Sequence, residues 1–340
     1  MRVGVVGCGY WGAKHVRVLQ SLSDVEQVAL IDPRKASRAT LEKAFPQLLS
    51  FNNLDEALAH VDAIVIATPP SSHATLGLRA LHAAKHVLIE KPLATNTKDA
   101  QALVDAAEAT GMTLMVGHTF EYNPAVWHLR EILESGELGD IHYIDTARLN
   151  LGVYQQDVNV IWDLAPHDVS ITNYILRSIP QRVHAWGGSH AHHFLEDVAY
   201  LRLEYKEIDV AAHVHVSWLD PCKVRRVTVV GSSKMAVYND LVTDERLRIY
   251  DKGVTPVAEG ASLADLPMSY RYGAIVSPFI KFEEPLRIED QHFVECILEG
   301  RTPNTDGASG LAVVKVLEAA TISLREGCPV HIEQQALTLR

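Results

Sequence analysis

Cysteine, basic charge and long apolar runs are scarce in this chain of 340 residues. The four cysteines, Cys8, Cys222, Cys296 and Cys328, form no Cys-x-x-Cys pair, so neither a disulfide framework nor a zinc knuckle is indicated. No apolar run has the roughly 18 residues of a membrane span, and the N-terminus MRVGVVGCGY lacks the pattern of a signal peptide. We therefore expect a cytoplasmic protein with free thiols.

Acidic residues outnumber basic ones, 42 to 31, which gives a formal net charge of −11. This charge opposes a polyanionic partner over most of the surface, so nucleic acid binding is not expected, although one pocket can still be positive enough for a small anion. Hydrophobic residues make up 47% of the chain, and glycine and proline are too few for a disordered or collagen-like polymer. The length fits about two folded domains.

The first third alternates short apolar runs with segments of helical periodicity, which is typical of a parallel sheet with crossover helices. Strands are expected at 2–6, 27–31, 63–67, 86–89 and 113–116, and helices at 11–22, 33–44, 73–83 and 98–110. The last of these helices ends at Gly111, a plausible C-cap. The fold class of this part is therefore α/β with a doubly wound parallel sheet.

After about Asn123 the pattern changes to alternating runs such as IHYIDTARLNL and IDVAAHVHVSW, interrupted by helices near 160–176, 290–298 and 308–325. These runs predict an α+β domain with an open, largely antiparallel sheet. The segment 252–284 has three prolines and little periodicity, so we expect an irregular excursion there. The predicted domains are 1–122 and 123–340.

A glycine motif, GCGYWG, follows the first strand and opens the first helix. The pattern G-x-G-x-x-G gives a tight turn, close backbone approach to a pyrophosphate and a helix N-terminus aimed at its charge. Asp32, at the end of the second strand, can accept hydrogen bonds from a ribose diol, which favours NAD over NADP unless Arg34 binds a 2′-phosphate. A turn used only for packing is the alternative. The expected cofactor contacts here are Gly7, Gly9, Tyr10, Trp11, Gly12, Asp32 and Arg34.

Two further clusters follow predicted strands at their carboxyl ends, where open α/β sheets bind ligands. Thr68, Pro69, Pro70 and His73 follow one strand, and Glu90 and Lys91 of Glu-Lys-Pro follow another. All six are predicted to lie beside the cofactor. Ser71 or Ser72 can instead cap a helix, and Lys91 taken alone can be a solvated surface residue.

In the second domain, Asp163 and His167 are four residues apart in a predicted helix. This spacing puts both on one face, where the carboxylate can orient the imidazole. A solvated polar edge is the alternative, but the apolar neighbours Trp162 and Leu164 favour partial burial, which is costly for an unpaired polar group.

Three other groups of side chains have the residue types of binding sites. Neither His190, His192 and His193 nor His213 and His215 have the spacing or the carboxylate and thiolate partners of a metal site, so no metal is expected. The basic residues Lys223, Arg225 and Arg226 are expected to form a solvated face, with a phosphate contact from one arginine as the alternative.

Taken together, the dinucleotide motif, Thr-Pro-Pro-x-x-His, Glu-Lys-Pro and Asp-x-x-x-His resemble the glucose-fructose oxidoreductase, inositol dehydrogenase and rhizopine catabolism family (Gfo/Idh/MocA) over nearly the whole chain. The resemblance implies a Rossmann domain with NAD or NADP, and a second domain whose open sheet accepts a sugar and forms subunit contacts. It also implies that Lys91 is the active-site lysine, and that Asp163 and His167 are the acid/base pair.

The version NVIWDLAPHD after ARLNLG looks like a subgroup of this family, the 3-dehydrogenases of UDP-N-acetylglucosamine or its uronic acid. This likeness implies an NAD-dependent oxidation of the sugar C3 hydroxyl, with Arg148, Asn150 and Asn159 near the sugar and diphosphate. We expect His167 to accept the hydroxyl proton, Asp163 to hold its tautomer and Lys91 to hydrogen-bond the reacting oxygen. The reverse roles of His167 and Lys91 stay open.

Two alternatives remain for the function. One is a dehydrogenase of a free polyol such as inositol. The other is a non-catalytic Rossmann protein that senses a nucleotide, against which the set of Lys91, Asp163 and His167 argues. A homo-dimer or homo-tetramer is expected, because alternating strands such as IDVAAHVHV predict an apolar outer sheet face.

Overall fold

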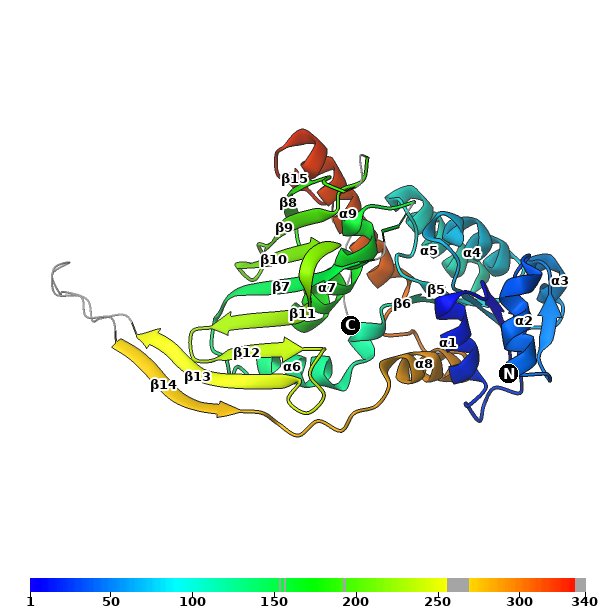
Figure 1. Cartoon of the computed structure of the whole chain (residues 1–340), viewed down its shortest axis with the longest axis horizontal. Coiled ribbons are helices and arrows are strands. Elements are labelled where there is room, and N and C mark those ends of the chain that lie inside the picture. The colour runs from blue at the N-terminus through cyan, green and yellow to red at the C-terminus, as the bar shows by residue number, and fades with distance from the viewer. Residues whose placement is uncertain (153, 156, 192–193, 256–268, 334–340) are drawn as a thin grey trace.

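The computed structural model describes residues 1–152, 154–155, 157–191, 194–255 and 269–333, and places them in two sheets with helices between and beside them (Figure 1). The strands of the first sheet are β1 (Arg2–Val6), β2 (Gln27–Ile31), β3 (Leu49–Phe51), β4 (Ala63–Ile66), β5 (His86–Glu90) and β6 (Leu114–Gly117). Its helices are α1 (Tyr10–Leu19), α2 (Lys35–Ala44), α3 (Leu54–Leu58), α4 (His73–His82) and α5 (Thr97–Thr110), with 3-10 turns η1 (Pro70–Ser72) and η2 (Thr119–Tyr122).

This first sheet is parallel throughout, in the order β3-β2-β1-β4-β5-β6. The order reverses between β1 and β4, and a doubly wound sheet binds its ligand outside the carboxyl ends of the strands at such a reversal. The five predicted strands are confirmed within about one residue, and Gly111 is the left-handed C-cap of α5. Only the short edge pair β3 and α3 was missed, because β3 is largely exposed and has no apolar run to signal it.

The second sheet has the order β14-β13-β12-β11-β7-β10-β9-β8-β15, in which only β7 and β10 are parallel. Its strands are β7 (Ile141–Leu151), β8 (Arg182–Gly188), β9 (Val198–Tyr205), β10 (Val210–Ser217), β11 (Leu219–Gly231), β12 (Met235–Asn239), β13 (Leu247–Thr255), β14 (Ser269–Val276) and β15 (Val330–His331). The remaining helices are α6 (Pro124–Glu134), α7 (Val160–Leu176), α8 (Pro285–Glu299) and α9 (Gly307–Glu326). The predicted fold class, a parallel Rossmann sheet followed by a largely antiparallel open sheet, is confirmed.

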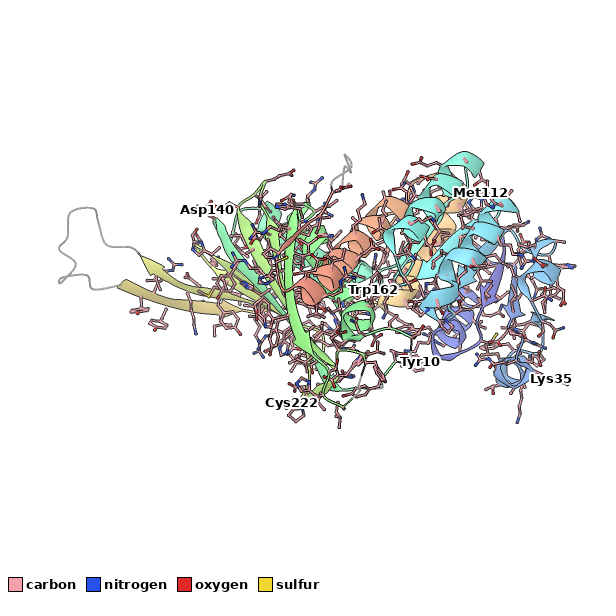
Figure 2. The ribbon with its side chains drawn as sticks, turned by 90° about the horizontal axis from the view of Figure 1, so that it is seen from above. Tyr10, Lys35, Met112, Asp140, Trp162 and Cys222 are labelled. Atoms are coloured by element: carbon pink, nitrogen blue, oxygen red, sulfur yellow. The ribbon has the colours of Figure 1, made fainter. Side chains whose placement is uncertain are left out.

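Helices α7 and α9 lie between the nine-stranded sheet and the Rossmann half, as the view from above shows (Figure 2). Helix α9 packs against both α7 and α5, and α8 returns to pack against α1. Among the described helices, α9 alone has the length and apolar composition of a membrane span, but 61% of that window is buried inside the protein. These contacts join the two halves around the carboxyl edge of the first sheet.

The prediction of an irregular segment at 252–284 was wrong for residues 252–255 and 269–276, which are strand, while residues 277–284 are irregular as expected. The described part of this segment contains β14, which pairs with β13 as a hairpin at the end of the second sheet and extends beyond the body of the molecule (Figure 1). Residues 270–276 of β14 are all exposed, on both faces of the strand. A strand without a buried face does not need alternating polarity, so periodicity gave no signal. Residues 256–268 lie outside the described part.

Candidate active site

The glycine turn between β1 and α1 has the geometry of a pyrophosphate site. Gly7 has a φ of +92°, and a Cβ at Gly12 would lie 1.7 Å from the Gly7 carbonyl oxygen. Each position therefore requires glycine. A Cβ at Gly9 would meet nothing within 4 Å, and Gly9 caps α1 without a side-chain hydrogen bond. Open space and free N–H groups thus meet where the phosphates of a dinucleotide are expected.

Asp32 stands at the end of β2 and is almost fully buried. Its Oδ2 accepts a hydrogen bond from the Cys8 main-chain N–H at 2.9 Å, and its Oδ1 accepts one from the Arg34 N–H at 2.8 Å. Burial raises its pKa, but hydrogen bonds from Arg34 and Cys8 outweigh burial and lower the pKa below its usual value. The Arg34 guanidinium also contacts both carboxylate oxygens at 3.2 Å while 70% exposed. Asp32 is therefore an ionised acceptor whose outer partner, Arg34, is exposed to solvent.

A cavity of about 230 Å³ lies next to this turn and is lined by Trp11, Thr68, Pro69, Pro70, Glu90, Lys91 and Asp163 among others. Tyr10 and Trp11 present their rings to Lys14, whose Nζ lies 4.3 and 4.6 Å from the two ring centroids. His73 differs from the prediction, because it is fully buried. Its ring nitrogens lie 2.8 Å from the Pro92 carbonyl oxygen and 2.9 Å from that of Thr68. It braces two loops of the site.

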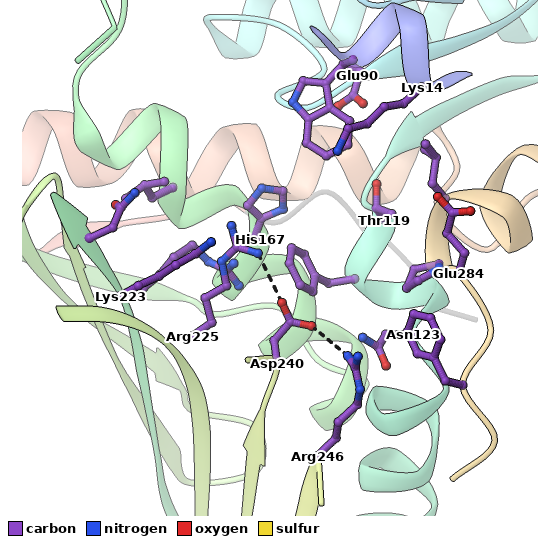
Figure 3. Close-up of a pocket in the computed structure, with 18 of the residues that line it drawn as sticks. Lys14, Glu90, Thr119, Asn123, His167, Lys223, Arg225, Asp240, Arg246 and Glu284 are labelled. Carbon is purple, nitrogen blue, oxygen red and sulfur yellow. Dashed lines mark hydrogen bonds and ion pairs between the residues drawn. The ribbon is translucent and has the colours of Figure 1, made fainter. Parts of the chain in front are cut away.

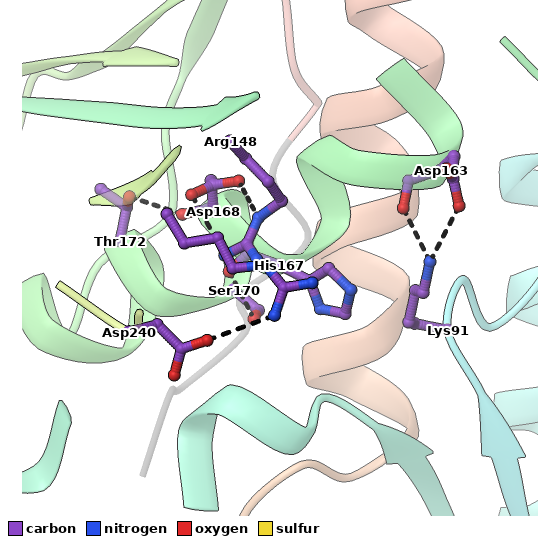
Figure 4. Close-up of polar contacts among 9 residues, drawn as sticks. Lys91, Arg148, Asp163, His167, Asp168, Ser170, Thr172 and Asp240 are labelled. Atoms are coloured by element: carbon purple, nitrogen blue, oxygen red, sulfur yellow. Dashed lines mark hydrogen bonds and ion pairs between the residues drawn. The ribbon is translucent and has the colours of Figure 1, made fainter. Parts of the chain in front are cut away.

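Lys91 and Asp163 form an ion pair across the two halves of the protein (Figure 4). Lys91 Nζ donates to the Asp163 main-chain carbonyl at 2.7 Å and to its Oδ1 at 3.3 Å. Trp218 Nε1 donates to the other carboxylate oxygen at 3.0 Å. All three side chains are largely buried, so the ammonium is fixed in position at the carboxyl end of β5.

His167 lies one turn further along α7, but the expected contact with Asp163 does not form: the carboxylate binds Lys91 and Trp218 instead. The imidazole packs edge-on against Phe120 at a centroid distance of 4.9 Å, and its buried Nδ1 has no hydrogen-bond partner within the described residues. Burial, followed by the charges of Lys91 and Arg148, holds the pKa of His167 well below its ordinary value. His167 is thus a neutral imidazole, able to accept a proton.

The remaining substrate candidates are placed differently. Arg148 is buried, donates to Asp168 Oδ2 at 2.7 Å and lies over the Phe120 ring. Asn150 lines the same cavity as Arg148. Asn159 is placed elsewhere. Its side-chain carbonyl caps α7, and its side-chain amide donates to Glu196 at 2.7 Å. Because both ends are occupied in the described structure, Asn159 is a helix cap rather than a substrate contact.

A second cavity, of about 370 Å³, is lined by His167, which Figure 3 labels, and by Arg148 and Asn150. Trp11 and Glu90 line both cavities, so the two adjoin. Five cationic side chains face the larger one: Lys14, Arg148, Lys223, Arg225 and Arg246. Three acidic side chains oppose them: Glu90, Asp240 and Glu284. The predicted solvated face was therefore partly wrong, because Lys223 and Arg225 line the cavity.

Sequence reasoning missed a buried charged cluster behind Glu90. His15, on α1, lies 3.2 Å from Glu90 Oε1 and 2.8 Å from Asp290 Oδ1, and all three are buried. Burial alone would lower the pKa of His15, yet Asp290 and Glu90 raise it well above its usual value. In the sequence, His15 is 75 residues from Glu90 and 275 residues from Asp290, so no local pattern connects the three. The only sequence signal was that a histidine and two carboxylates occupy apolar-looking positions.

Two histidines of the groups at 190–193 and 213–215 have partners within the protein. His190 pairs with Asp197 at 2.8 Å, and His192 and His193 lie outside the described residues. His215 stacks on Tyr200 at a centroid distance of 4.0 Å. Nowhere in the described parts of the chain do three or more His, Cys, Asp or Glu side chains gather as a metal site would require.

Models of known families match both halves of the chain. The oxidoreductase family with an NAD-binding Rossmann fold, GFO_IDH_MocA, matches residues 1–118, and the GFO/IDH/MocA C-terminal domain matches residues 126–237. The solved structure of GenD2 from gentamicin A biosynthesis, in complex with NAD, is 25% identical with a TM-score of 0.82 and covers 98% of this chain and 97% of its own.

Relatives over the full length have several substrates. UDP-N-acetylglucosamine 3-dehydrogenase of Acidithiobacillus ferrooxidans is 34% identical over 98% of this chain and 99% of its own. A 4-carboxy-2-hydroxymuconate-6-semialdehyde dehydrogenase of Sphingobium is 26% identical (96% and 99%), and inositol 2-dehydrogenase of Rhizobium meliloti is 22% identical (98% and 99%). The family model matched by residues 1–118 is that of an NAD-binding Rossmann fold, and the GenD2 structure contains NAD. Residues 1–118 therefore form an NAD-binding domain, and the expected cofactor, NAD, is confirmed.

Proposed function

Because this chain belongs to the GFO/IDH/MocA family of NAD-binding oxidoreductases, we propose that it oxidises the C3 hydroxyl of a UDP-linked amino sugar. The substrate would be UDP-N-acetylglucosamine or its uronic acid, and the product the 3-keto sugar. The class is established more broadly: the chain is an NAD-dependent sugar or polyol dehydrogenase. Within that class, the full-length similarity to a UDP-N-acetylglucosamine 3-dehydrogenase favours the nucleotide-linked sugar.

One observation carries the proposed chemistry: of two adjoining cavities, one is lined by a neutral imidazole and the other by a fixed ammonium. His167 opens on the larger cavity, and Lys91 lines the smaller one that continues from the glycine turn. A dehydrogenase needs a group that takes the hydroxyl proton and a donor that stabilises the oxygen as it becomes a ketone. The two side chains supply both functions without a metal ion.

Oxidation removes two hydrogens from the C3 position: the ring hydrogen with its electron pair, and the hydroxyl proton. Bound NAD supplies the acceptor for the hydride. His167, uncharged because of its lowered pKa, takes the hydroxyl proton. Lys91 donates a hydrogen bond to the oxygen, and Asp163 fixes that ammonium by accepting two of its contacts. Asp163 is therefore assigned to Lys91 rather than to the tautomer of His167.

The reverse assignment, with Lys91 as the base, uses the same atoms and remains the alternative.

The residues that would hold NAD are Gly7, Gly9 and Gly12 for the pyrophosphate, Asp32 for the adenosine ribose, and Thr68, Pro69 and Pro70 along the adjoining cavity. These positions supply the free N–H groups, the ionised acceptor and the open space that a dinucleotide needs.

The test supplies NAD and a panel of UDP-sugars, free sugars and free polyols, together with an aminotransferase or a carbonyl trap. The trap is needed because oxidation of a secondary alcohol by NAD is unfavourable near neutral pH, so the ketone accumulates poorly. We expect the mass of UDP-N-acetylglucosamine or its uronic acid to fall by two hydrogens, or the derived amine to form. Turnover of free inositol or glucose with none of any UDP-sugar would contradict the proposal.

A further inference from the structure

Lys223, Arg225 and Arg246 form a cationic wall of the larger cavity (Figure 3). Lys223 and Arg225 both come from β11 and line the cavity, Arg225 in regular pairing with β7 and Lys223 within the register shift that precedes Val224. Arg246 approaches from the start of β13, and its guanidinium lies over the Phe282 ring at 4.5 Å. Arg226 is exposed and does not line the cavity in the described structure, which makes it a matched control on the same strand.

Asp240 bridges the guanidiniums of Arg225 and Arg246. Its Oδ2 lies 3.3 Å from Arg225 Nη1, and its Oδ1 lies 3.4 Å from Arg246 Nη1. The same carboxylate accepts from the Tyr238 hydroxyl at 3.0 Å, which in turn accepts from Asn123 Nδ2 at 2.9 Å. A single carboxylate, held by this buried chain, thus faces two guanidiniums and leaves them under-neutralised.

The wall keeps surplus positive charge in a protein of formal net charge −11. Lys223 is exposed at the cavity rim, and the buried Nε of Arg246 has no partner among the described residues. Arg148, which also lines the cavity, is already neutralised by Asp168. Guanidinium groups with unused donors in a partly closed cavity are suited to an oxyanion with several oxygens, because charge-assisted bonds are strongest there.

We infer that the cationic wall of Lys223, Arg225 and Arg246 is the subsite for the diphosphate linker of a nucleotide sugar. This inference rests on the proposed function. It moves the diphosphate from Asn159, which the fold uses as a cap, to a wall that the hairpin of β12 and β13 brings beside β11. A diphosphate offers more charge and more oxygens than one carboxylate, so it matches three cations better than a uronate does.

The experiment measures binding of UDP to the NAD-saturated enzyme by calorimetry, so that the cofactor site is already filled. We expect Arg225→Gln and Arg246→Gln each to weaken UDP binding about tenfold to hundredfold, as charged hydrogen bonds do. Arg226→Gln should change it by less than about twofold. With UDP-sugar as substrate, kcat/KM should fall in the wall variants mainly through KM. Far-ultraviolet circular dichroism and bound NAD verify folding of each variant.

The arms of the experiment separate the outcomes. Unchanged UDP affinity in folded Arg225→Gln and Arg246→Gln would overturn the subsite while leaving the reaction intact. If glucuronate binds as tightly as UDP and loses affinity in the same variants, the wall binds a carboxylate and the diphosphate assignment is wrong. If wild-type enzyme binds no UDP and turns over only free polyols, the proposed function fails with it.

Discussion

The ammonium of Lys91 is held by two oxygens of a single residue, Asp163, from the other half of the chain. Neither this pair nor His167 belongs to the glycine turn that binds the dinucleotide. We therefore expect Lys91→Ala and His167→Asn to lower turnover by on the order of 10² to 10⁴ while NAD affinity stays nearly intact. Steady-state kinetics and NAD titration check this, and normal turnover in either variant would remove that residue from the mechanism.

The pH profile distinguishes the two candidate bases. The pKa of His167 is lowered by burial and by the charges of Lys91 and Arg148, so the imidazole stays neutral well below pH 6.5. If His167 accepts the proton, the acid limb of kcat/KM lies below that pH and disappears in His167→Asn. An acid limb that persists unchanged in this variant would assign the base to another group.

Asp32 sets the preference between NAD and NADP. Its carboxylate is ionised and buried, so it accepts bonds from a ribose diol and repels a 2′-phosphate. We expect kcat/KM to be higher with NAD, and Asp32→Ala to reduce that preference, because the lost bonds contribute roughly 1.5 to 3 kcal/mol. A wild-type preference for NADP would instead point to Arg34 as the phosphate contact.

Glu121 makes stability depend on pH. Burial raises its pKa to about 8, whereas in the unfolded chain it ionises near 4.5. The contribution of Glu121 to the free energy of unfolding is therefore greatest below about pH 4.5. It is lost as the pH rises toward 8, because the unfolded chain gives up the proton while the folded chain keeps it. Glu121→Gln has nearly the shape of the protonated side chain but does not ionise. Between pH 5 and 8 its free energy of unfolding should therefore rise relative to that of wild type by on the order of 4 kcal/mol.

Urea unfolding at several pH values measures this difference, with Glu108→Gln on the exposed side of α5 as control. Wild type and Glu121→Gln with parallel stability curves would show that Glu121 ionises normally in the folded protein.

At the scale of elements, His15 ties α1 to β5 and α8. It is buried between Glu90 and Asp290, and its removal would leave two carboxylates without their partner. His15→Leu should therefore destabilise the fold by about 3 to 5 kcal/mol near neutral pH. Since the pKa of His15 is raised, its stabilising charge is present below about pH 6.5 and is lost only as the pH rises through the higher folded value.

The control for this prediction is His128→Leu, which breaks an exposed histidine–glutamate pair on α6. That pair should contribute less than about 1 kcal/mol. Equal losses in the two variants, measured by urea unfolding, would mean that the buried cluster does not hold these elements together.

Elements with one buried face or a continuous apolar run were predictable from sequence, and elements without either were not. The parallel strands and α7 follow strong periodic or capped patterns, so their bounds agree closely with expectation. β14 is exposed on both faces and β3 is a short edge strand, and neither has a pattern to read. Lys91 and Asp163 are 72 residues apart in the sequence, so only the packing of the fold brings them into contact. Helical spacing alone pairs Asp163 with His167 instead.

At the scale of the whole molecule, the outer face of the nine-stranded sheet carries exposed side chains that no other described residue of the chain covers. The valines of β10 point inward, so the apolar outer surface comes from neighbouring strands: Tyr143, Trp186 and Tyr200 are 41%, 50% and 38% exposed. Trp186 stacks on Tyr200 at 5.7 Å. Such a patch on an open sheet favours association.

A homo-dimer or homo-tetramer therefore stays our prediction. Light scattering at micromolar concentration should give a multiple of the chain mass, and Trp186→Arg should shift the protein toward monomer. Glu108→Gln, on the exposed side of α5 and away from this sheet, is the control. Wild-type protein that is only monomeric at this concentration would contradict the expectation.

The central claim is that hydride leaves C3 of a UDP-linked amino sugar in the cavity of His167. The most direct measurement uses UDP-N-acetylglucosamine or its uronic acid carrying deuterium at C3, incubated with enzyme and NAD under trapping conditions. We predict that the deuterium appears in the reduced nicotinamide and that the trapped sugar has lost it. Deuterium retained in an oxidised sugar, or reduced nicotinamide formed without label, would contradict the account.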